Sequence, residues 1–170
     1  MKFIKEIFEK DVFGKEILRN DMKLTIRRSV RAVAFNKEQK FPLVFLSEND
    51  YHIIPGGKID EGETLESALR REFMEEVGFD LKITEEVGVI VMHEYYEETL
   101  HINYCYLGKI LGDEKERVYT TEESDQVPVV KWFRLEDAIK VLKADKPRND
   151  LGKFNRFRDL AFLEEARSSE

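Results

Sequence analysis

The sequence lacks the features of secreted disulfide-rich proteins and of membrane-spanning proteins. Cys105 is the single cysteine among 170 residues, so no intrachain disulfide is expected. No apolar run reaches the roughly 18 residues of a membrane-spanning helix, and the start, MKFIKEIFEK, is too charged for a signal peptide. We therefore expect a reducing, cytoplasmic setting and no membrane partner.

Clustered positive charge is also missing. Lys and Arg number 28 against 35 Asp and Glu, the net charge is −7, and no Lys/Arg run is longer than two residues. Proteins that bind duplex nucleic acid normally carry a basic stripe on one face. The composition therefore argues against a duplex nucleic-acid partner, whereas a small anionic ligand is acceptable if a cation accompanies it.

The sequence does contain enough apolar residues, 42%, to pack a core in one domain spanning residues 1–170. The order of apolar patterns and turns is typical of an α/β fold, a mixed β-sheet flanked by helices. Residues 1–22, an N-terminal extension, are predicted to form a hairpin that turns at Gly14. The other predicted strands are 25–35, 41–47, 51–55, 81–96, 100–110 and 127–133, and the predicted helices are 64–77, 135–143 and 150–170.

A glycine-rich loop precedes the first of these helices. The loop is PGGKIDEGE, residues 55–63, and its glycines argue against regular structure. Thr64 is placed to cap the helix at its N-terminus, and Gly78 is placed to end it.

Three glutamates near the end of this helix, Glu72, Glu75 and Glu76, lie in an unusual direction. At about 100° per residue they fall on the same side as the apolar residues one and two turns earlier, whereas a solvated acidic face would lie opposite. Glu72 and Glu76 are like charges at i, i+4, which costs roughly 0.2–0.5 kcal/mol. A cluster of glutamates on a helix is more often a solvated surface. The inward direction and the glycine-rich loop favour instead a site for a divalent cation such as Mg²⁺ or Mn²⁺, which prefers oxygen ligands.

Gly57, Glu63 and the run REFMEEVGF (71–79) resemble the Nudix box, G-x5-E-x7-R-E-U-x-E-E-x-G-U, in which U is a bulky apolar residue. Every fixed position agrees, although Phe73 is bulkier than the Ile, Leu or Val that is usual at the first U. A strand ending in PGG precedes the box, and VVKWFRLEDA is similar to the strand and helix that follow it in the family. The resemblance covers roughly residues 25–145.

The resemblance implies an α/β/α sandwich and hydrolysis of a nucleoside diphosphate linked to another group, with Mg²⁺ or Mn²⁺ as cofactor. By the same resemblance, Arg71 would orient Glu72. Carried over position by position, the resemblance assigns Glu72, Arg71 and Glu75 as catalytic, Gly57, Glu72, Glu75, Glu76 and a later Glu123 as metal ligands, and Gly56 and Glu63 as supports of the loop.

The catalytic base is left open by the resemblance, because it varies within the family. Glu72 is the favoured base. Later acids are alternatives, as bases or extra ligands, although each is individually more often a surface charge. They are Glu94, Glu97, Glu98, Glu122, Glu123 and Asp125.

Substrate contacts are expected from a strand and from a pair of tyrosines. One or two of the strand's arginines, which include Arg28 and Arg31, can reach substrate phosphate, and solvated arginines are the equal alternative. Tyr95 and Tyr96 occupy a window that, within the family, hints at dinucleoside polyphosphates; these and nucleoside triphosphates are the favoured small nucleotide-type substrates. Arg158, far along the chain, is expected at the surface.

Three other functions are compatible with the same scaffold: a non-catalytic nucleotide sensor, an RNA 5′-end pyrophosphohydrolase, and an isomerase. Sensors usually lose box glutamates, which are intact here. The acidic balance disfavours RNA, and Cys105 sits in the middle of a predicted strand, where it is poorly placed for isomerase chemistry. Residues 1–22 and the last helix are candidates for a homodimer contact.

Overall fold

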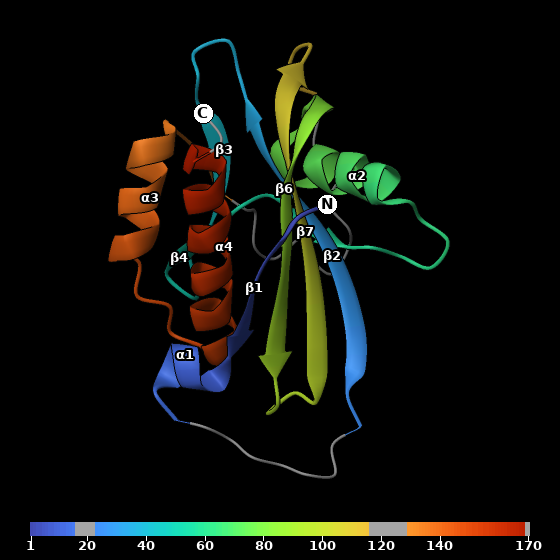
Figure 1. Ribbon diagram of the computed structural model, residues 1–170. Helices are drawn as coiled ribbons and strands as arrows, with labels where there is room; N and C mark the ends of the chain where they lie inside the picture. The colour runs from blue at the N-terminus through green and yellow to red at the C-terminus, as the bar shows by residue number, and fades with distance from the viewer. Residues whose placement is uncertain (16–22, 116–128, 169–170) are drawn as a thin grey trace.

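The computed structural model describes residues 1–15, 23–115 and 129–168 (Figure 1). The strands are β1 (Phe3–Phe8), β2 (Thr25–Phe35), β3 (Phe41–Leu46), β4 (Tyr51–Ile53), β5 (Gly56–Lys58), β6 (Asp80–Glu94), β7 (Thr99–Leu111) and β8 (Val129–Phe133). The helices are α1 (Glu9–Phe13), α2 (Leu65–Val77), α3 (Leu135–Ala144) and α4 (Asp150–Ser168). The predicted α/β class, a mixed sheet flanked by helices, is confirmed.

The strands form two sheets. The larger sheet has the order β1-β6-β7-β2-β5, in which β1 runs parallel to β6 and β2 parallel to β7, while β6–β7 and β2–β5 are antiparallel. The smaller sheet has the order β4-β3-β8 and is antiparallel. Figure 1 shows α2 on one side of the larger sheet and α3 and α4 on the other.

Alternating residues of β2 supply both faces of this arrangement. Val30 and Ala32 are fully buried in a cluster with Phe73 of α2. Val33 points to the opposite face and is buried in a cluster with Phe162 of α4. Because the side chains of a strand alternate between faces, one strand links the two cores and fixes α2 relative to α4.

Local capping sets the ends of α2 where the sequence predicted them. The Thr64 hydroxyl accepts a hydrogen bond from the Ser67 backbone N–H at 3.1 Å. Gly78 has a left-handed backbone, φ 82°, and its N–H donates to the carbonyl of Met74 at 3.0 Å. The glutamates predicted to lie on this helix are therefore carried by a helix with defined ends.

The N-terminal hairpin predicted from the sequence is wrong. Residues 3–8 form a strand parallel to β6, and the chain then turns into the short helix α1. The backbone N–H of Phe8 donates to the carboxylate of Asp11 at 2.9 Å, which starts this helix, and Gly14 ends it with φ 68°. The second arm of the hairpin falls on residues outside those that the structure describes.

The C-terminal helix α4 begins at Asp150, the residue at which the sequence predicted its start. Among the helices in the described ranges, none is long and apolar enough to cross a membrane.

Candidate active site

The glycine-rich loop lies directly against the acidic side of α2. Gly57 is so close to Glu72 that a side-chain Cβ at this position would overlap the Glu72 carboxylate. One residue earlier, the backbone N–H of Gly56 donates to a carboxylate oxygen of Glu76 at 2.7 Å. The two glycines therefore bring loop backbone and glutamate side chains into one place, as the sequence predicted for the loop and the helix.

Gly56 also makes a close approach to β2. Its φ is 133°, and a Cβ there would overlap the Val30 carbonyl oxygen. The buried Arg31 guanidinium donates from Nη1 to the carbonyls of Ile54 at 2.7 Å and Gly56 at 2.9 Å. Arg31, expected to bind substrate, thus also fastens the loop to the sheet.

Arg71 ties the loop to the helix. It donates to both carboxylate oxygens of Glu63, from Nε at 2.9 Å and from Nη2 at 2.8 Å, and to Glu72 from Nη1 at 2.8 Å. It also reaches the carbonyl of Lys58 at 3.0 Å and Glu75 at 3.3 Å. This planar fork holds the Glu72 carboxylate in one orientation relative to Glu63.

The environment makes Glu72 a better proton acceptor than a free glutamate. Its side chain is 16% exposed, and burial raises the pKa of the Glu72 carboxyl. Hydrogen bonding to Arg71 opposes this rise in pKa, while the neighbouring charge of Glu75 adds to it. The pKa of Glu63 is held at about 2, chiefly by its hydrogen bonds to Arg71. The two carboxylates on the same arginine therefore differ in basicity.

The donor chemistry at this point fits a divalent cation. Glu72, Glu75, Glu76 and the Gly57 carbonyl would offer only hard oxygen atoms, the ligands that Mg²⁺ and Mn²⁺ prefer. Within residues 1–15, 23–115 and 129–168, no three carboxylate, imidazole or thiol groups are already gathered as a metal site. Glu72 and Glu75 accept hydrogen bonds from Arg71, and Glu76 accepts one from the Gly56 N–H. A bound ion would therefore have to compete with those hydrogen bonds.

A cavity of about 440 Å³ opens beside Gly57, and we call it the cationic cleft. Burial lowers the pKa of Arg31 to about 10, with the nearby charge of Arg158 contributing, yet the guanidinium stays charged near neutral pH. Arg28 contributes from the same strand, and its guanidinium also lies over the Tyr104 ring at 5.6 Å. Among the residues that the structure describes, the lining includes five cationic side chains, Arg27, Arg28, Arg31, Lys58 and Arg158, and no carboxylate.

Helix α4 supplies a buried polar network that the sequence reading missed. Arg158, expected at the surface, has a side chain only 2% exposed, so that expectation is wrong. Its Nε donates to Asp159 at 2.7 Å and its Nη1 to Asn155 at 2.6 Å. The other Asp159 oxygen accepts from the backbone N–H of Ile54 at 2.9 Å, which ties α4 to the chain just before the loop.

One pattern in the sequence could have indicated this network. Asn155, Arg158 and Asp159 precede Phe162 at helical spacing, so they lie on one stripe with an apolar residue. The box glutamates show the same pattern, polar side chains that continue an apolar stripe. The same test applied to α4 would have predicted buried, paired polar groups.

A second cavity of about 440 Å³ adjoins the cationic cleft, and we call it the acidic cavity because its lining includes Glu9, Glu94, Glu97 and Asp150. The two share Arg27, His101 and Leu151 among their lining residues. Tyr96, 67% exposed, stands at the rim of the acidic cavity, whereas Tyr95 is not among its lining residues and instead donates its backbone N–H to Glu9.

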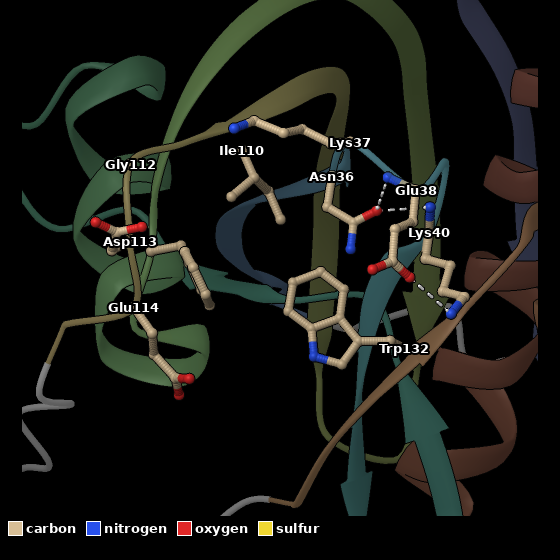
Figure 2. A pocket seen from close by; sticks show the side chains of 10 residues that line it. Asn36, Lys37, Glu38, Lys40, Ile110, Gly112, Asp113, Glu114 and Trp132 are labelled. Atoms are coloured by element: carbon tan, nitrogen blue, oxygen red, sulfur yellow. Dashed lines mark hydrogen bonds and ion pairs between the residues drawn. The ribbon is translucent and has the colours of Figure 1, made fainter.

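A third cavity, of about 560 Å³, lies beyond the C-terminal end of β2 (Figure 2). Trp132 lines it, and its ring meets Phe79, the last box residue, edge to face at 5.8 Å between centroids. Asn36, also in Figure 2, accepts hydrogen bonds from the backbone of Glu38 and Lys40 and so shapes the turn at the rim. None of the lining residues of this cavity belongs to the cationic cleft.

The remaining predicted residues divide into three groups. Glu123, with Glu122 and Asp125, lies outside the described residues. Glu97 and Glu98 are exposed in the turn between β6 and β7. Glu97 lines the acidic cavity, and Glu94 is buried in it. Cys105 is fully buried, and burial raises the pKa of its thiol, which disfavours the thiolate that an isomerase would need.

Comparison with known proteins agrees with this geometry. The sequence model of the NUDIX domain matches residues 25–153. A human diphosphoinositol polyphosphate phosphohydrolase is 27% identical over 71% of this chain and 65% of its own length, and a mouse diphosphoinositol polyphosphate phosphohydrolase 3-alpha is 26% identical over 71% and 72%. The chain thus spans about two thirds of the length of these relatives.

Solved structures share the fold. A NUDIX hydrolase from Nitrosomonas europaea is 18% identical, with a TM-score of 0.63 over 85% of this chain and 90% of that chain. A MutT protein from Methanosarcina mazei is 22% identical, with a TM-score of 0.60 over 88% and 99%. At these identities the likeness supports the fold, and the family follows from the matched domain. The chain belongs to the NUDIX family.

Proposed function

We propose that the protein is a divalent-metal-dependent pyrophosphohydrolase that cleaves a phosphoanhydride in a nucleoside diphosphate linked to another group. The observation that carries the proposal is the acidic side of α2 packed against the loop at Gly57, beside the cationic cleft. An anhydride substrate needs both features, because its phosphates must be held by cations while water attacks one phosphorus.

In this proposal each group has a stated role, and Glu72 serves both as a metal ligand and as the base. Mg²⁺ or Mn²⁺, when bound by Glu72, Glu75, Glu76 and Gly57, would supply charge neutralisation and a more acidic water. Arg31 and Arg158 hold phosphate oxygens. Water forms a new P–O bond as the bridging P–O bond breaks, and its proton passes to Glu72, whose pKa is raised by burial. Arg71 orients Glu72 throughout.

The favoured substrates are nucleoside triphosphates and dinucleoside polyphosphates. The names of the curated relatives point to diphosphoinositol polyphosphates as a second candidate, and the cationic lining beside Gly57 favours any polyphosphate. A highly phosphorylated ring would carry anionic groups on every side. The adjoining acidic cavity would repel them, which favours a substrate that is anionic at one end only.

The test is Glu76→Gln, assayed with Mg²⁺ and Mn²⁺ by phosphate release on nucleoside triphosphates, dinucleoside polyphosphates, ADP-ribose and a diphosphoinositol polyphosphate. We expect kcat to fall on the order of a thousandfold on whichever substrate is cleaved, because several kcal/mol of charge stabilisation are lost. The control is Glu66→Gln on the exposed side of the same helix, which should leave kcat unchanged. Near-normal turnover by a folded Glu76→Gln protein would refute the metal assignment.

A further inference from the structure

The acidic cavity lies between α1, the turn after β6 and the first residues of α4. Phe13 and Phe154 line it and meet edge to face, with 5.6 Å between ring centroids. Leu151 adds an aliphatic contact and Tyr96 an exposed ring at the rim. Its volume, about 440 Å³, falls within the range of small-molecule sites. Phe13 comes from the N-terminal segment, outside the residues that match the NUDIX domain.

Two carboxylates are buried in this cavity, and one of them has an oxygen that is not satisfied. Glu9 is 2% exposed and accepts a hydrogen bond from the backbone N–H of Tyr95. Glu94 is 5% exposed, and its Oε2 lies 2.9 Å from Nε2 of His101. Within the described ranges, Glu94 Oε1 has no hydrogen-bond partner. A buried carboxylate oxygen without a donor is costly, so a ligand that brings an N–H group to Glu94 would be favoured.

The charge of the lining residues changes along β2, from positive in the cationic cleft to mostly negative in the acidic cavity. Gly57 pairs with Val30 in the sheet, and Arg27, shared by both cavities, lies three residues earlier on the same strand. At about 3.3 Å per residue, this is roughly 10 Å from the box. A nucleotide is built in the same way over a similar span: phosphates at one end, and at the other a neutral aromatic ring whose edge carries N–H donors.

We propose that the acidic cavity holds the nucleobase of the substrate and that Glu94 accepts a hydrogen bond from an exocyclic amino group of that base. Phe13 and Phe154 provide apolar and aromatic contact for the ring, as aromatic side chains do for unstacked bases. Glu9 and Glu94 together repel phosphate, so the nucleotide can enter in one direction only. The inference rests on the proposed function, since it assigns the nucleoside half of that substrate.

The first experiment measures binding without chemistry. AMP, GMP and IMP are titrated calorimetrically into wild-type protein, Glu94→Met and Glu94→Gln. IMP lacks the exocyclic amino group of AMP and GMP. We expect AMP or GMP to bind wild-type protein at least tenfold more tightly than IMP. Glu94→Met should remove that preference while leaving IMP binding within about twofold. Glu94→Gln, which keeps the size and one acceptor, should retain part of the preference and serves if the Met variant does not fold.

The control is Glu98→Gln, in the exposed turn next to the cavity but not among its lining residues, which should keep the preference intact. Equal binding of AMP, GMP and IMP by wild-type protein would overturn the inference. So would a preference that survives in both Glu94 variants.

The second experiment separates this inference from the proposed function. Hydrolysis of ATP, GTP and ITP is followed in wild-type protein and in Glu94→Met. If the three are cleaved equally by both proteins, the pyrophosphohydrolase proposal stands and the base assignment falls. If neither these three nor any other substrate of the panel is cleaved but the Glu94-dependent binding preference is present, the base assignment stands and the proposed reaction falls.

Discussion

Two arginines organise the two halves of the site, and they differ in exposure and in how far along the chain their networks reach. The Arg71 side chain is 31% exposed, and its carboxylate partners Glu63, Glu72 and Glu75 come from the same loop and helix. The Arg158 side chain is 2% exposed. Arg158 contacts Asp159, and Asp159 in turn accepts a hydrogen bond from Ile54, which lies 105 residues earlier in the sequence.

The comparison separates geometry set by short-range spacing from geometry set by packing. Helical spacing alone places Arg71 beside Glu75, and the box loop is short enough to bring Glu63 to the same point. Helical spacing also places Arg158 beside Asn155 and Asp159. Nothing local, however, places Arg158 beside Asn103 of β7, or Asp159 beside Ile54; those contacts exist only when α4 docks on the sheet. We therefore expect loss of the Arg158 network to lower stability as well as phosphate binding, and loss of the Arg71 network to act mainly on rate.

The largest effect should come from Arg158→Met. It would leave Asp159, which is 0% exposed, as a buried charge without its guanidinium, and such losses cost about 3–5 kcal/mol of unfolding free energy. Urea denaturation measures this cost. The control is Arg167→Met near the end of α4, whose side chain is 46% exposed and pairs with Glu136 at 3.7 Å; it should cost less than about 1 kcal/mol. Equal small losses in both variants would mean that burial does not distinguish the two arginines.

A smaller effect, and on rate, is expected from Arg71→Lys. Lysine keeps the positive charge but cannot contact both Glu63 oxygens and Glu72 at once, so Glu72 loses its fixed orientation. Misplacement of a reacting group by about 1 Å can cost roughly a hundredfold in rate, which is the expected loss in kcat. The unfolding free energy should change by less than about 1 kcal/mol, because the pairs are partly exposed. Steady-state kinetics on the substrate identified by the panel gives kcat.

The matched control for that change is Arg70→Lys. Arg70 precedes Arg71 on the helix but turns outward to Glu66 and Asp80. Its replacement should leave kcat within about twofold of wild type. If Arg70→Lys lowers the rate as much as Arg71→Lys does, the effect belongs to helix charge and not to the orientation of Glu72.

The sequence predicted most of what depends on short-range order. Apart from β5, the strands from residue 25 onward, the ends of α2 at Thr64 and Gly78, and the approach of the glycine-rich loop to the glutamates were all set by alternation, capping and spacing. These features are local, because each depends on residues no more than about 20 positions apart in the sequence. The exception, β5 (Gly56–Lys58), was assigned to irregular loop but pairs with β2.

The failures have a common physical cause. Residues 3–8 were assigned to a hairpin, but they pair with β6, more than eighty residues later, where Ile7 enters the core. Arg158 was assigned to the surface because arginine usually is there. It is buried because α4 docks on the sheet, where Arg158 contacts Asn103 of β7 as well as Asn155 and Asp159 of its own helix. Long-range contacts overrode local pattern in both cases, and the same contacts build the acidic cavity from α1, β6 and α4.

The smallest expected effect is a dependence on pH within the Arg71 network. Hydrogen bonding to Arg71 depresses the pKa of Glu63 from 4.5 to about 2 in the folded protein. A carboxylate with a depressed folded-state pKa contributes stability that is present above pH 4.5 and is lost as pH falls towards 2. The difference in unfolding free energy between wild type and Glu63→Gln should therefore be constant above about pH 5 and shrink between pH 4.5 and 2. Urea denaturation of the metal-free protein across this range measures it, and carboxylates common to both proteins cancel in the difference.

Glu61→Gln, an exposed acid in the same loop, is the charge-matched control and should show a weaker trend. A Glu63→Gln difference that does not change with pH would mean that Arg71 does not hold Glu63 in solution, and the loop would then depend on Arg31 and Gly56 alone.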